Sequence, residues 1–332
     1  MQTFSAQQAA ELASVTRGDL IESRHLGSLV VLAPDGSPAL TLGAPQEPVY
    51  ARSALKPLQA IASMNAGAEL QGAQIALAAG SHTGSFEHMK VAQSILAEAN
   101  LTAEALACPS AWPADEPSYQ ALLQAGRGKQ KLAFNCSGKH AAFLWACVKS
   151  GWPIETYTSP DHPLQQLVVE TIRDFTGEEP QQLTVDGCGT PLVATSLLGL
   201  ARAYSTLGSA VENIQADARA ATVATAMVDY PEYVHAPGGS DTLLAVHLDA
   251  VVKRGAEGVL AIGLRSGASV ALKIEDGSNR AAPLVAVRAL QAAGFLETAQ
   301  ADQALEAVLR PVLGGDQPVG AIELGAAFEG LL

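Results

Sequence analysis

Residues 258–264, GVLAIGL, and residues 268–274, ASVALKI, are two apolar runs on either side of the turn Arg265-Ser266-Gly267. Apolar runs of this length around a short turn that contains glycine are typical of a β-hairpin. A helical pattern follows from about Arg280 to Ala293. The C-terminal part of the chain is therefore predicted to form two paired strands with a helix beside them.

A second hairpin is predicted near the N-terminus. Residues 25–33, HLGSLVVLA, and residues 39–43, ALTLG, flank the turn Pro34-Asp35-Gly36. Strands thus come from both ends of the chain. One sheet can collect them if the residues between the hairpins form an insertion.

The chain between the hairpins is predicted to be mainly helical, because alanine and leucine recur there at helical spacing. The expected helices are Ala54–Asn65, Glu87–Ala99, Pro117–Ala125, Lys139–Lys149, His162–Phe175, Pro191–Tyr204, Ser209–Val228 and Asp241–Val251. Asp161 and Ser240 are the expected N-caps of two of these helices. Residues 182–185 form an expected strand.

These patterns predict an α+β protein with a mixed sheet. We expect a discontinuous sheet-containing domain from residues 1–52 and 252–332, and a mainly helical domain from residues 53–251. An insertion of this kind creates a cleft at the junction of the two parts, where we expect the active site.

The 332 residues carry a net charge of −13, with 48% apolar and 16% charged residues. This balance is typical of a chain that buries a sizeable core. The acidic excess argues against nucleic acid or an anionic membrane as a partner. No secretory signal and no membrane-spanning run is visible. Since the four cysteines form neither a CxxC pair nor a dense framework, we expect a cytoplasmic protein.

The segment Arg52-Ser53-Ala54-Leu55-Lys56-Pro57 carries the clearest chemical signal. Residues three apart lie on one helical face, so the Lys56 amine is expected to reach the Ser53 hydroxyl. A serine becomes a nucleophile when a base takes its proton, and a buried neutral lysine is such a base. The pair is typical of acyl-transfer enzymes with a Ser-x-x-Lys motif.

Pro57 limits where the helix in this segment can begin. Because proline disfavours helical backbone at the residue before it, the helix must begin close to Ser53 or kink there. A helix that begins at Ser53 would direct backbone N–H groups and the positive end of its dipole toward the hydroxyl.

The loop Gly80-Ser81-His82-Thr83-Gly84-Ser85 offers a second hydroxyl at Ser81 and a proton carrier or substrate contact at His82. The same residues are also typical of a polar turn in which Ser85 caps the next helix. Both interpretations stay open from the residues alone.

Two further turns contain cysteine beside glycine. Cys136 and Lys139 lie in residues 135–140, NCSGKH, and Cys188 lies in residues 186–191, DGCGTP. Two sulfurs suit zinc, and Lys139 can join them if it loses its proton. Buried cysteines that act as small apolar residues are the alternative. Asp186 stands where it can bind a substrate ammonium group.

Lys253-Arg254-Gly255 immediately precedes the strand expected at residues 258–264. Enzymes of the penicillin-recognising group with a Ser-x-x-Lys motif carry Lys-Thr-Gly on a strand beside the nucleophile. The match is partial because arginine stands in the middle position, and an exposed turn is the alternative.

Together these segments resemble the Rhizobium etli-type L-asparaginases, the thermolabile class 3 family that is unrelated to the common bacterial type. The resemblance is carried by residues 22–27 (ESRHLG), 52–59 (RSALKPLQ), 80–84 (GSHTG), 135–140 (NCSGKH), 186–191 (DGCGTP) and 253–258 (KRGAEG). Their order and spread cover about residues 20 to 285.

The resemblance implies a homodimeric amidohydrolase with a fold similar to serine β-lactamases and glutaminases. It implies two catalytic serine–lysine tandems, Ser53 with Lys56 and Ser81 with Lys253. Lys273 on the adjacent strand competes with Lys253 for the last position.

The resemblance also implies a zinc site and a substrate site. Its zinc ligands map to Cys136, Lys139 and Cys188, and this metal is thought to assist substrate binding rather than to activate water. Arg52 and Asp186 match positions near the substrate, and His82 is a further predicted substrate contact.

The predicted reaction is hydrolysis of L-asparagine to L-aspartate and ammonia. In it, Ser53 Oγ loses its proton within a network of Lys56, Ser81 and Lys253 and attacks the side-chain amide carbon. Two ammonium groups in a desolvated cleft repel each other, so the pKa of at least one lysine is expected to fall toward neutrality.

Three other functions stay open. A glutaminase differs by one methylene of substrate, which a pocket discriminates by only ~1–3 kcal/mol. A β-lactamase or D,D-peptidase shares the Ser-x-x-Lys logic and predicts a periplasmic address. A zinc-binding or amino-acid-binding protein on the same scaffold predicts ligand binding without turnover.

Overall fold

Strand β2 (Leu20–Leu32) is the element around which the main sheet is built. The computed structural model describes residues 2–332 of the chain. The first half of β2 pairs with β1 (Ala10–Arg17) and its second half with β3 (Pro38–Leu42), both antiparallel. Its other edge pairs with β9 (Ser269–Ile274), which comes from the far end of the chain.

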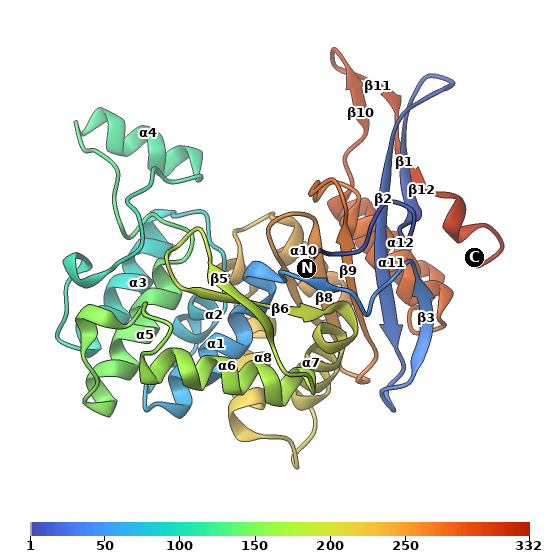
Figure 1. Ribbon diagram of the computed structural model, residues 1–332. Helices are drawn as coiled ribbons and strands as arrows, with labels where there is room; N and C mark the ends of the chain where they lie inside the picture. The colour runs from blue at the N-terminus through green and yellow to red at the C-terminus, as the bar shows by residue number, and fades with distance from the viewer. Residues whose placement is uncertain (1) are drawn as a thin grey trace.

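The main sheet collects strands from both ends of the sequence, as predicted, but the prediction of a mixed sheet was wrong, because every strand pair in it is antiparallel. Its order is β12-β1-β2-β9-β8-β7, with β3 beside β2. The remaining strands are β7 (Ala250–Arg254), β8 (Val259–Leu264) and β12 (Ile322–Leu324). Both predicted hairpins are confirmed, as β2–β3 and β8–β9. The molecule is an α+β protein in which the sheet occupies one side and most helices the other (Figure 1).

The helices and small strands complete the chain. The helices are α1 (Lys56–Asn65), α2 (Ala73–Ala78), α3 (Phe86–Glu98), α4 (Glu116–Gln124), α5 (Ser137–Ser150), α6 (Pro163–Thr176), α7 (Leu197–Ala210), α8 (Ala218–Asp229), α9 (Pro231–Val234), α10 (Ser240–Leu248), α11 (Ala282–Ala292) and α12 (Thr298–Val308). The 3-10 turns are η1 (Arg52–Leu55), η2 (Ala103–Ala105), η3 (Ile154–Thr156) and η4 (Ala326–Phe328). The small sheets are β4 (Pro48–Val49) with β6 (Pro191–Ser196) and β5 (Gln181–Val185), and β10 (Val312–Gly314) with β11 (Gln317–Gly320).

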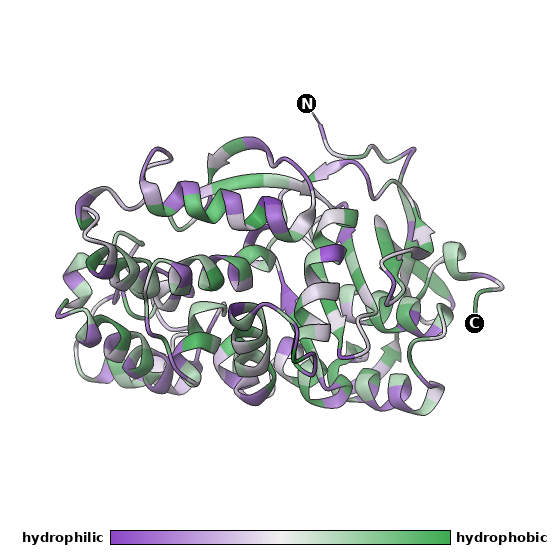
Figure 2. Ribbon diagram, turned by 90° about the horizontal axis from the view of Figure 1, so that it is seen from below, coloured by the Kyte–Doolittle hydropathy of each residue, from purple (hydrophilic) through white to green (hydrophobic). Residues whose placement is uncertain are grey.

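Helices cover both faces of the main sheet. Leu29 and Val31 of β2 lie in a core shared with α11 and α12, whereas Val30 and Leu32 lie in the core of the helical part. Because neither face is open to water, every residue of β8 is buried, which explains its continuous apolar run. In Figure 2 the strands of this sheet are coloured largely as hydrophobic.

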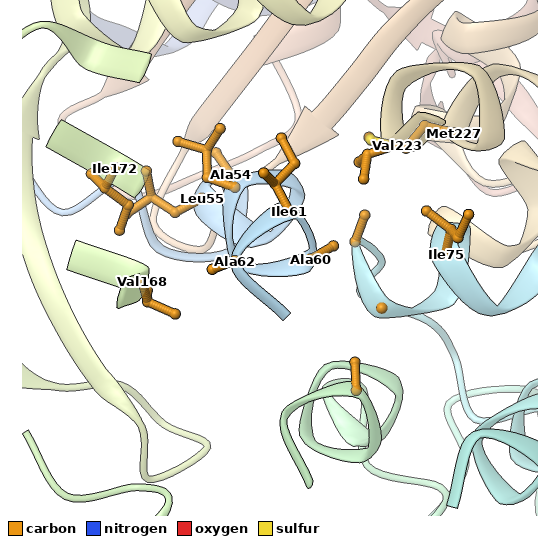
Figure 3. Packing of buried hydrophobic residues seen from close by; sticks show 14 of the residues in the cluster. Ala54, Leu55, Ala60, Ile61, Ala62, Ile75, Val168, Ile172, Val223 and Met227 are labelled. Carbon is orange, nitrogen blue, oxygen red and sulfur yellow. The ribbon is translucent and has the colours of Figure 1, made fainter. Parts of the chain in front are cut away.

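Helix α1 runs through the centre of the helical part. Its residues from Lys56 to Met64 are all buried, so this helix has no face toward solvent. Figure 3 shows Ala60, Ile61 and Ala62 surrounded by apolar side chains of α2, α6 and α8. This packing fixes the position of the Ser53–Lys56 segment at the start of α1.

Sequence patterns placed several boundaries wrongly. Residues 191–204 were expected to be one helix, but β6 occupies their first part because it pairs with β4 and β5. The helix expected over 209–228 is interrupted, and α8 starts only after Asp217, whose side chain caps it. The expected strand at 182–185 is confirmed within β5.

The two expected N-caps were wrong by one residue. His162 rather than Asp161 caps α6, because its ring nitrogen accepts the Leu164 N–H. Gly239 precedes α10, so Ser240 is its first helical residue. The division into residues 1–52 with 252–332 and residues 53–251 stays a prediction. Within residues 2–332, no helix combines the length and the apolar character needed to cross a membrane.

Two glycines let α7 lie directly on strand β8. A Cβ at Gly263 would overlap the Tyr204 carbonyl oxygen, and one at Gly208 would overlap the Leu264 carbonyl oxygen. We expect Gly263→Ala to lower the free energy of unfolding by about 3 kcal/mol, because helix and strand must move apart. Urea denaturation measures this loss. Gly128→Ala is the control, since nothing lies within 4 Å of its Cβ, and equal effects in the two variants would contradict the explanation.

Candidate active site

Ser53 lies in a 3-10 turn, and α1 begins three residues later. The turn spans Arg52–Leu55, and Pro57 occupies the first turn of α1, where its missing N–H costs no hydrogen bond. Arg52 has a φ of +54°, a left-handed conformation that costs about 1–3 kcal/mol in a residue other than glycine. Arg52 Nε donates to Asp186 Oδ1 at 2.7 Å, which holds the turn in place.

Lys56 is buried and donates in three directions. Its Nζ lies 2.5 Å from the Gly80 carbonyl oxygen, 3.0 Å from Ser81 Oγ and 3.2 Å from the Asn135 carbonyl oxygen. The Ser53 hydroxyl makes no hydrogen bond to any of residues 2–332. Lys56 therefore donates to Ser81 rather than to Ser53, the partner that i, i+3 spacing suggests.

One of the two interpretations of the loop at residues 80–85 is confirmed, and the functional one stays a prediction. Ser85 caps α3 with a reciprocal bond to His88, which confirms the capping interpretation. His82 Nδ1 accepts the Gly84 N–H, so Nε2 carries the proton and donates to Ser137 Oγ at 3.0 Å. Burial, with the nearby His88 and Lys56, holds the pKa of His82 well below its usual value. The His82 ring is therefore neutral and held in one orientation.

Lys253 is fully buried on β7 and points into the helical part. Alternation along β7 puts Val251 in the core of the helical part, and Lys253 lies on that same face. Its Nζ donates to the Arg254 carbonyl oxygen at 2.8 Å and lies 3.8 Å from Asp241 Oδ2. Burial lowers the pKa of Lys253 to about 7, with Lys56 and Arg254 adding to the shift and Asp241 opposing it.

Asp241 is a residue of this cluster that the sequence did not single out. It is buried at the start of α10, and its carboxylate accepts the Arg254 N–H at 3.0 Å. Burial opposes its ionisation, but Lys253 and Arg254 hold the pKa of Asp241 below its usual value. The Ser240-Asp241 pair was considered only as a helix start, so its pairing with Lys253 was missed.

Lys273, the alternative to Lys253 as the second catalytic lysine, makes its hydrogen bonds outside this cluster. Its Nζ donates to the carbonyl oxygens of Glu257 at 2.6 Å and Ile274 at 2.9 Å. It is partly exposed and lines a different hollow, of about 350 Å³, which also includes Arg52. Lys253 is the lysine that shares a buried region with Lys56.

Cys136, Lys139 and Cys188 come together at the start of α5. Lys139 Nζ donates to Cys188 Sγ at 3.0 Å and to Thr190 Oγ1 at 2.8 Å. The neighbouring Cys136 thiol lowers the pKa of Cys188 despite burial, and Cys188 together with burial raises the pKa of Cys136 well above its usual value. Burial alone would lower the pKa of Lys139, but the two sulfurs raise it.

This cluster can hold zinc only if Lys139 takes part. Among residues 2–332 there is no group of three His, Cys, Asp or Glu side chains placed to hold a metal ion. Two sulfurs, one of them favoured as a thiolate, nevertheless suit zinc. His140 lies near Cys188, and its Nε2 is buried without a hydrogen-bond partner in residues 2–332. This unpartnered ring nitrogen near the Cys188 sulfur fits a site that binds a cation.

A pocket of about 400 Å³ is lined by six of the ten predicted site residues. Ser53 lines it together with Arg52, His82, Cys136, Asp186 and Cys188. Lys56, Ser81 and Lys253 are not among its lining residues. Ser53 and the Arg52–Asp186 ion pair therefore line the pocket, whereas the buried Lys56 and Lys253 do not.

Comparison with known proteins identifies the family of the chain. The sequence model of the L-asparaginase II family matches residues 13–324, which is nearly the whole chain. A comparison with curated proteins found no match. The family match agrees with the resemblance to the Rhizobium etli-type asparaginases. The chain therefore belongs to the L-asparaginase II family and is an amidohydrolase.

Proposed function

We propose that this protein hydrolyses L-asparagine to L-aspartate and ammonia through an acyl-enzyme on Ser53. The observation that carries the proposal is the position of Ser53. It lines a pocket beside the Arg52–Asp186 ion pair, and its hydroxyl has no hydrogen bond to residues 2–332 that would compete with substrate. Two lysines, Lys56 and Lys253, are buried and do not line this pocket.

Arg52 and Asp186 suit the two charges of a free amino acid. Asp186 Oδ1 accepts from Arg52 Nε and from the Gly187 N–H, which leaves Oδ2 for the substrate ammonium group. The guanidinium N–H groups of Arg52 remain for the α-carboxylate. Binding at these two groups orients the side-chain amide for attack, and His82 supports the wall of the pocket.

The chemistry divides between the two serine–lysine pairs. Lys253, with a pKa of about 7, has a neutral amine in about half of the molecules near neutral pH and is the base of the network. In this network, Lys56 and Ser81 link Ser53, on the pocket wall, to Lys253. Ser53 Oγ attacks the amide carbon, the C–N bond breaks, and ammonia leaves with a proton from the network. Water then cleaves the ester to give L-aspartate.

Zinc belongs to the proposal as a cofactor that positions substrate. Cys136, Lys139 and Cys188 would hold it, and Lys139 must lose its proton to do so. A bound zinc would order this wall of the pocket and supply positive charge near the substrate. The chain's own residues bind the amino acid and carry the proton with or without it.

Asp241 sets the pH dependence of the reaction. Activity is expected to rise with pH through about 7 as Lys253 loses its proton. The negative charge of Asp241 raises the pKa of Lys253, so Asp241→Asn is expected to move the acid limb to lower pH, by about one unit. The measurement is kcat/KM for asparagine from pH 5 to 9. A limb that stays in place, or moves to higher pH, would contradict this role.

The assembly and fold of the family complete the proposal. We infer a homodimer, supported by Leu183 and Val185, which are 56% and 63% exposed on β5 directly before Asp186. Light scattering should give twice the 34.2 kDa of one chain, and a mass of one chain would reject the dimer.

The sheet built from both chain ends supports a β-lactamase-like fold, and four free thiols support a reducing, cytoplasmic location.

Ammonia release from L-asparagine and L-glutamine tests the proposed substrate. We expect asparagine to have the higher kcat/KM. Glutaminase is the second candidate, because a pocket of about 400 Å³ also has room for one more methylene. A higher rate with glutamine would select it. Absence of ammonia from either amide, with labelling of Ser53 by penicillin, would point to a β-lactamase-like enzyme, and amino-acid binding without turnover to a non-catalytic protein.

A further inference from the structure

A further hollow lies at the end of β7, next to Arg254. Its volume is about 570 Å³, and the elements around it are the starts of α10 and α11, the end of α12, β10 and β12. In Figure 1 these elements lie on the side of the molecule that carries the main sheet. We call this hollow the arginine pocket, after Arg254, Arg280 and Arg310, which line it.

The arginine pocket is positive on a protein that is strongly negative. Three of the chain's twelve arginines line it, and no aspartate or glutamate does, although the chain carries a net charge of −13. Arg280 and Arg310 have no carboxylate partner among residues 2–332. Arg280 donates to His25 Nε2 and Ser23 Oγ, and Arg310 only to carbonyl oxygens of its own segment. Neither guanidinium is therefore paired directly with a carboxylate among residues 2–332.

Arg254 is the innermost of the three guanidiniums. It pairs with Asp241 at 3.4 Å and contacts His235, a ring that burial holds neutral by lowering its pKa to about 4. Asp241 lies behind Arg254, in a narrow extension of the hollow. The one buried carboxylate at this end of the hollow is thus shared between Arg254 and Lys253.

Uncharged donors also converge on the arginine pocket. Asn279 lines it, and its Oδ1 is buried with no hydrogen-bond partner in residues 2–332. An amide in such a place can turn its NH₂ group toward a bound acceptor. α10 and α11 both begin at the hollow, at Ser240 and Ala282, and helix N-termini favour negative charge.

We propose that the arginine pocket binds a small organic anion with two or more negative charges, carried by carboxylate or phosphate groups. Three guanidiniums suit the planar oxygens of such groups, and the volume exceeds what a single halide fills. The site is separate from the asparagine pocket. The two sites are linked through Arg254. An anion bound to Arg254 would change the charge around Asp241, and this carboxylate also lies near Lys253.

Calorimetric titration of the full-length protein with citrate and with pyrophosphate tests this site, without asparagine and at constant ionic strength set with NaCl. We expect saturable binding of at least one of the two anions. Citrate binding would identify carboxylates as the ligand groups, and pyrophosphate binding would identify phosphates. Because no turnover is measured, an inactive enzyme would leave the result intact.

Arg310→Gln is the main variant, because this side chain donates only to neighbouring carbonyl oxygens and its loss leaves the fold unchanged. We expect about tenfold weaker binding in Arg310→Gln, and a similar loss in Arg280→Gln. Arg219→Gln, an exposed arginine on α8, is the matched control and should bind as the wild type does. Absence of saturable binding in the wild type, or an equal loss in Arg219→Gln, would overturn the proposal.

Discussion

Ser53→Ala is expected to lower kcat for L-asparagine by about 10⁴-fold or more, because the nucleophile is lost and water must attack the amide unaided. Folding should not change. The Ser53 hydroxyl makes no hydrogen bond to residues 2–332, and the side chain is only partly buried. Ammonia release measures the rate, and thermal unfolding measures the stability. Ser94→Ala, on the exposed face of α3, is the control and should match the wild type in both.

A second serine makes the Ser53 experiment decisive. Ser81 Oγ is the hydroxyl that Lys56 contacts directly, at 3.0 Å, and Ser81 does not line the pocket. If Ser53→Ala kept a rate close to that of the wild type and Ser81→Ala did not, Ser81 would be the nucleophile. If Ser53 is the nucleophile, Ser81→Ala should slow the reaction less than Ser53→Ala does, because only proton transfer is impaired.

The sequence predicts the parts of the fold that depend on local pattern. The runs at 258–264 and 268–274 are continuous because β8 and β9 are covered on both faces, and such runs are recognisable without a structure. β1 and the first half of β2 were missed because neither shows a strand pattern: β1 buries four consecutive residues from Leu12 to Val15, the first half of β2 exposes Leu20 and Ile21, and β1 pairs with β12 from the far end of the chain. Long-range pairing of this kind leaves no local signal.

The candidate site, too, is predictable from the sequence only where local spacing decides it. Spacing within one segment predicts that Ser53 and Lys56 lie close together, but it does not predict that Lys56 turns toward Gly80, Ser81 and Asn135. That choice depends on two loops far away in sequence. Asp241 lies twelve residues before Lys253, and only the turn from α10 into β7 brings the two side chains together. Contacts between elements, rather than local spacing, therefore determine which of these side chains form hydrogen bonds and ion pairs with one another.

Lys253→Met is expected to lower kcat by about 10²- to 10⁴-fold, because it removes the amine whose pKa lies closest to neutrality. Methionine has nearly the same length as lysine and suits the apolar surroundings of β7. Lys273→Met is the matched control. Lys273 lies on β9 of the same sheet, with β8 between it and β7, and donates to the carbonyl oxygens of Glu257 and Ile274, so its loss should change kcat less than about threefold.

The pH profile separates a chemical role of Lys253 from a structural one. Residual activity of Lys253→Met should no longer rise through pH 7, because the group that titrates there is gone. Asp241 keeps Arg254 as an ionic partner, so thermal unfolding should show a folded protein. A folded Lys253→Met enzyme with an unchanged acid limb would assign the base to another group. Loss of activity in Lys273→Met instead would make Lys273 the partner of Ser81.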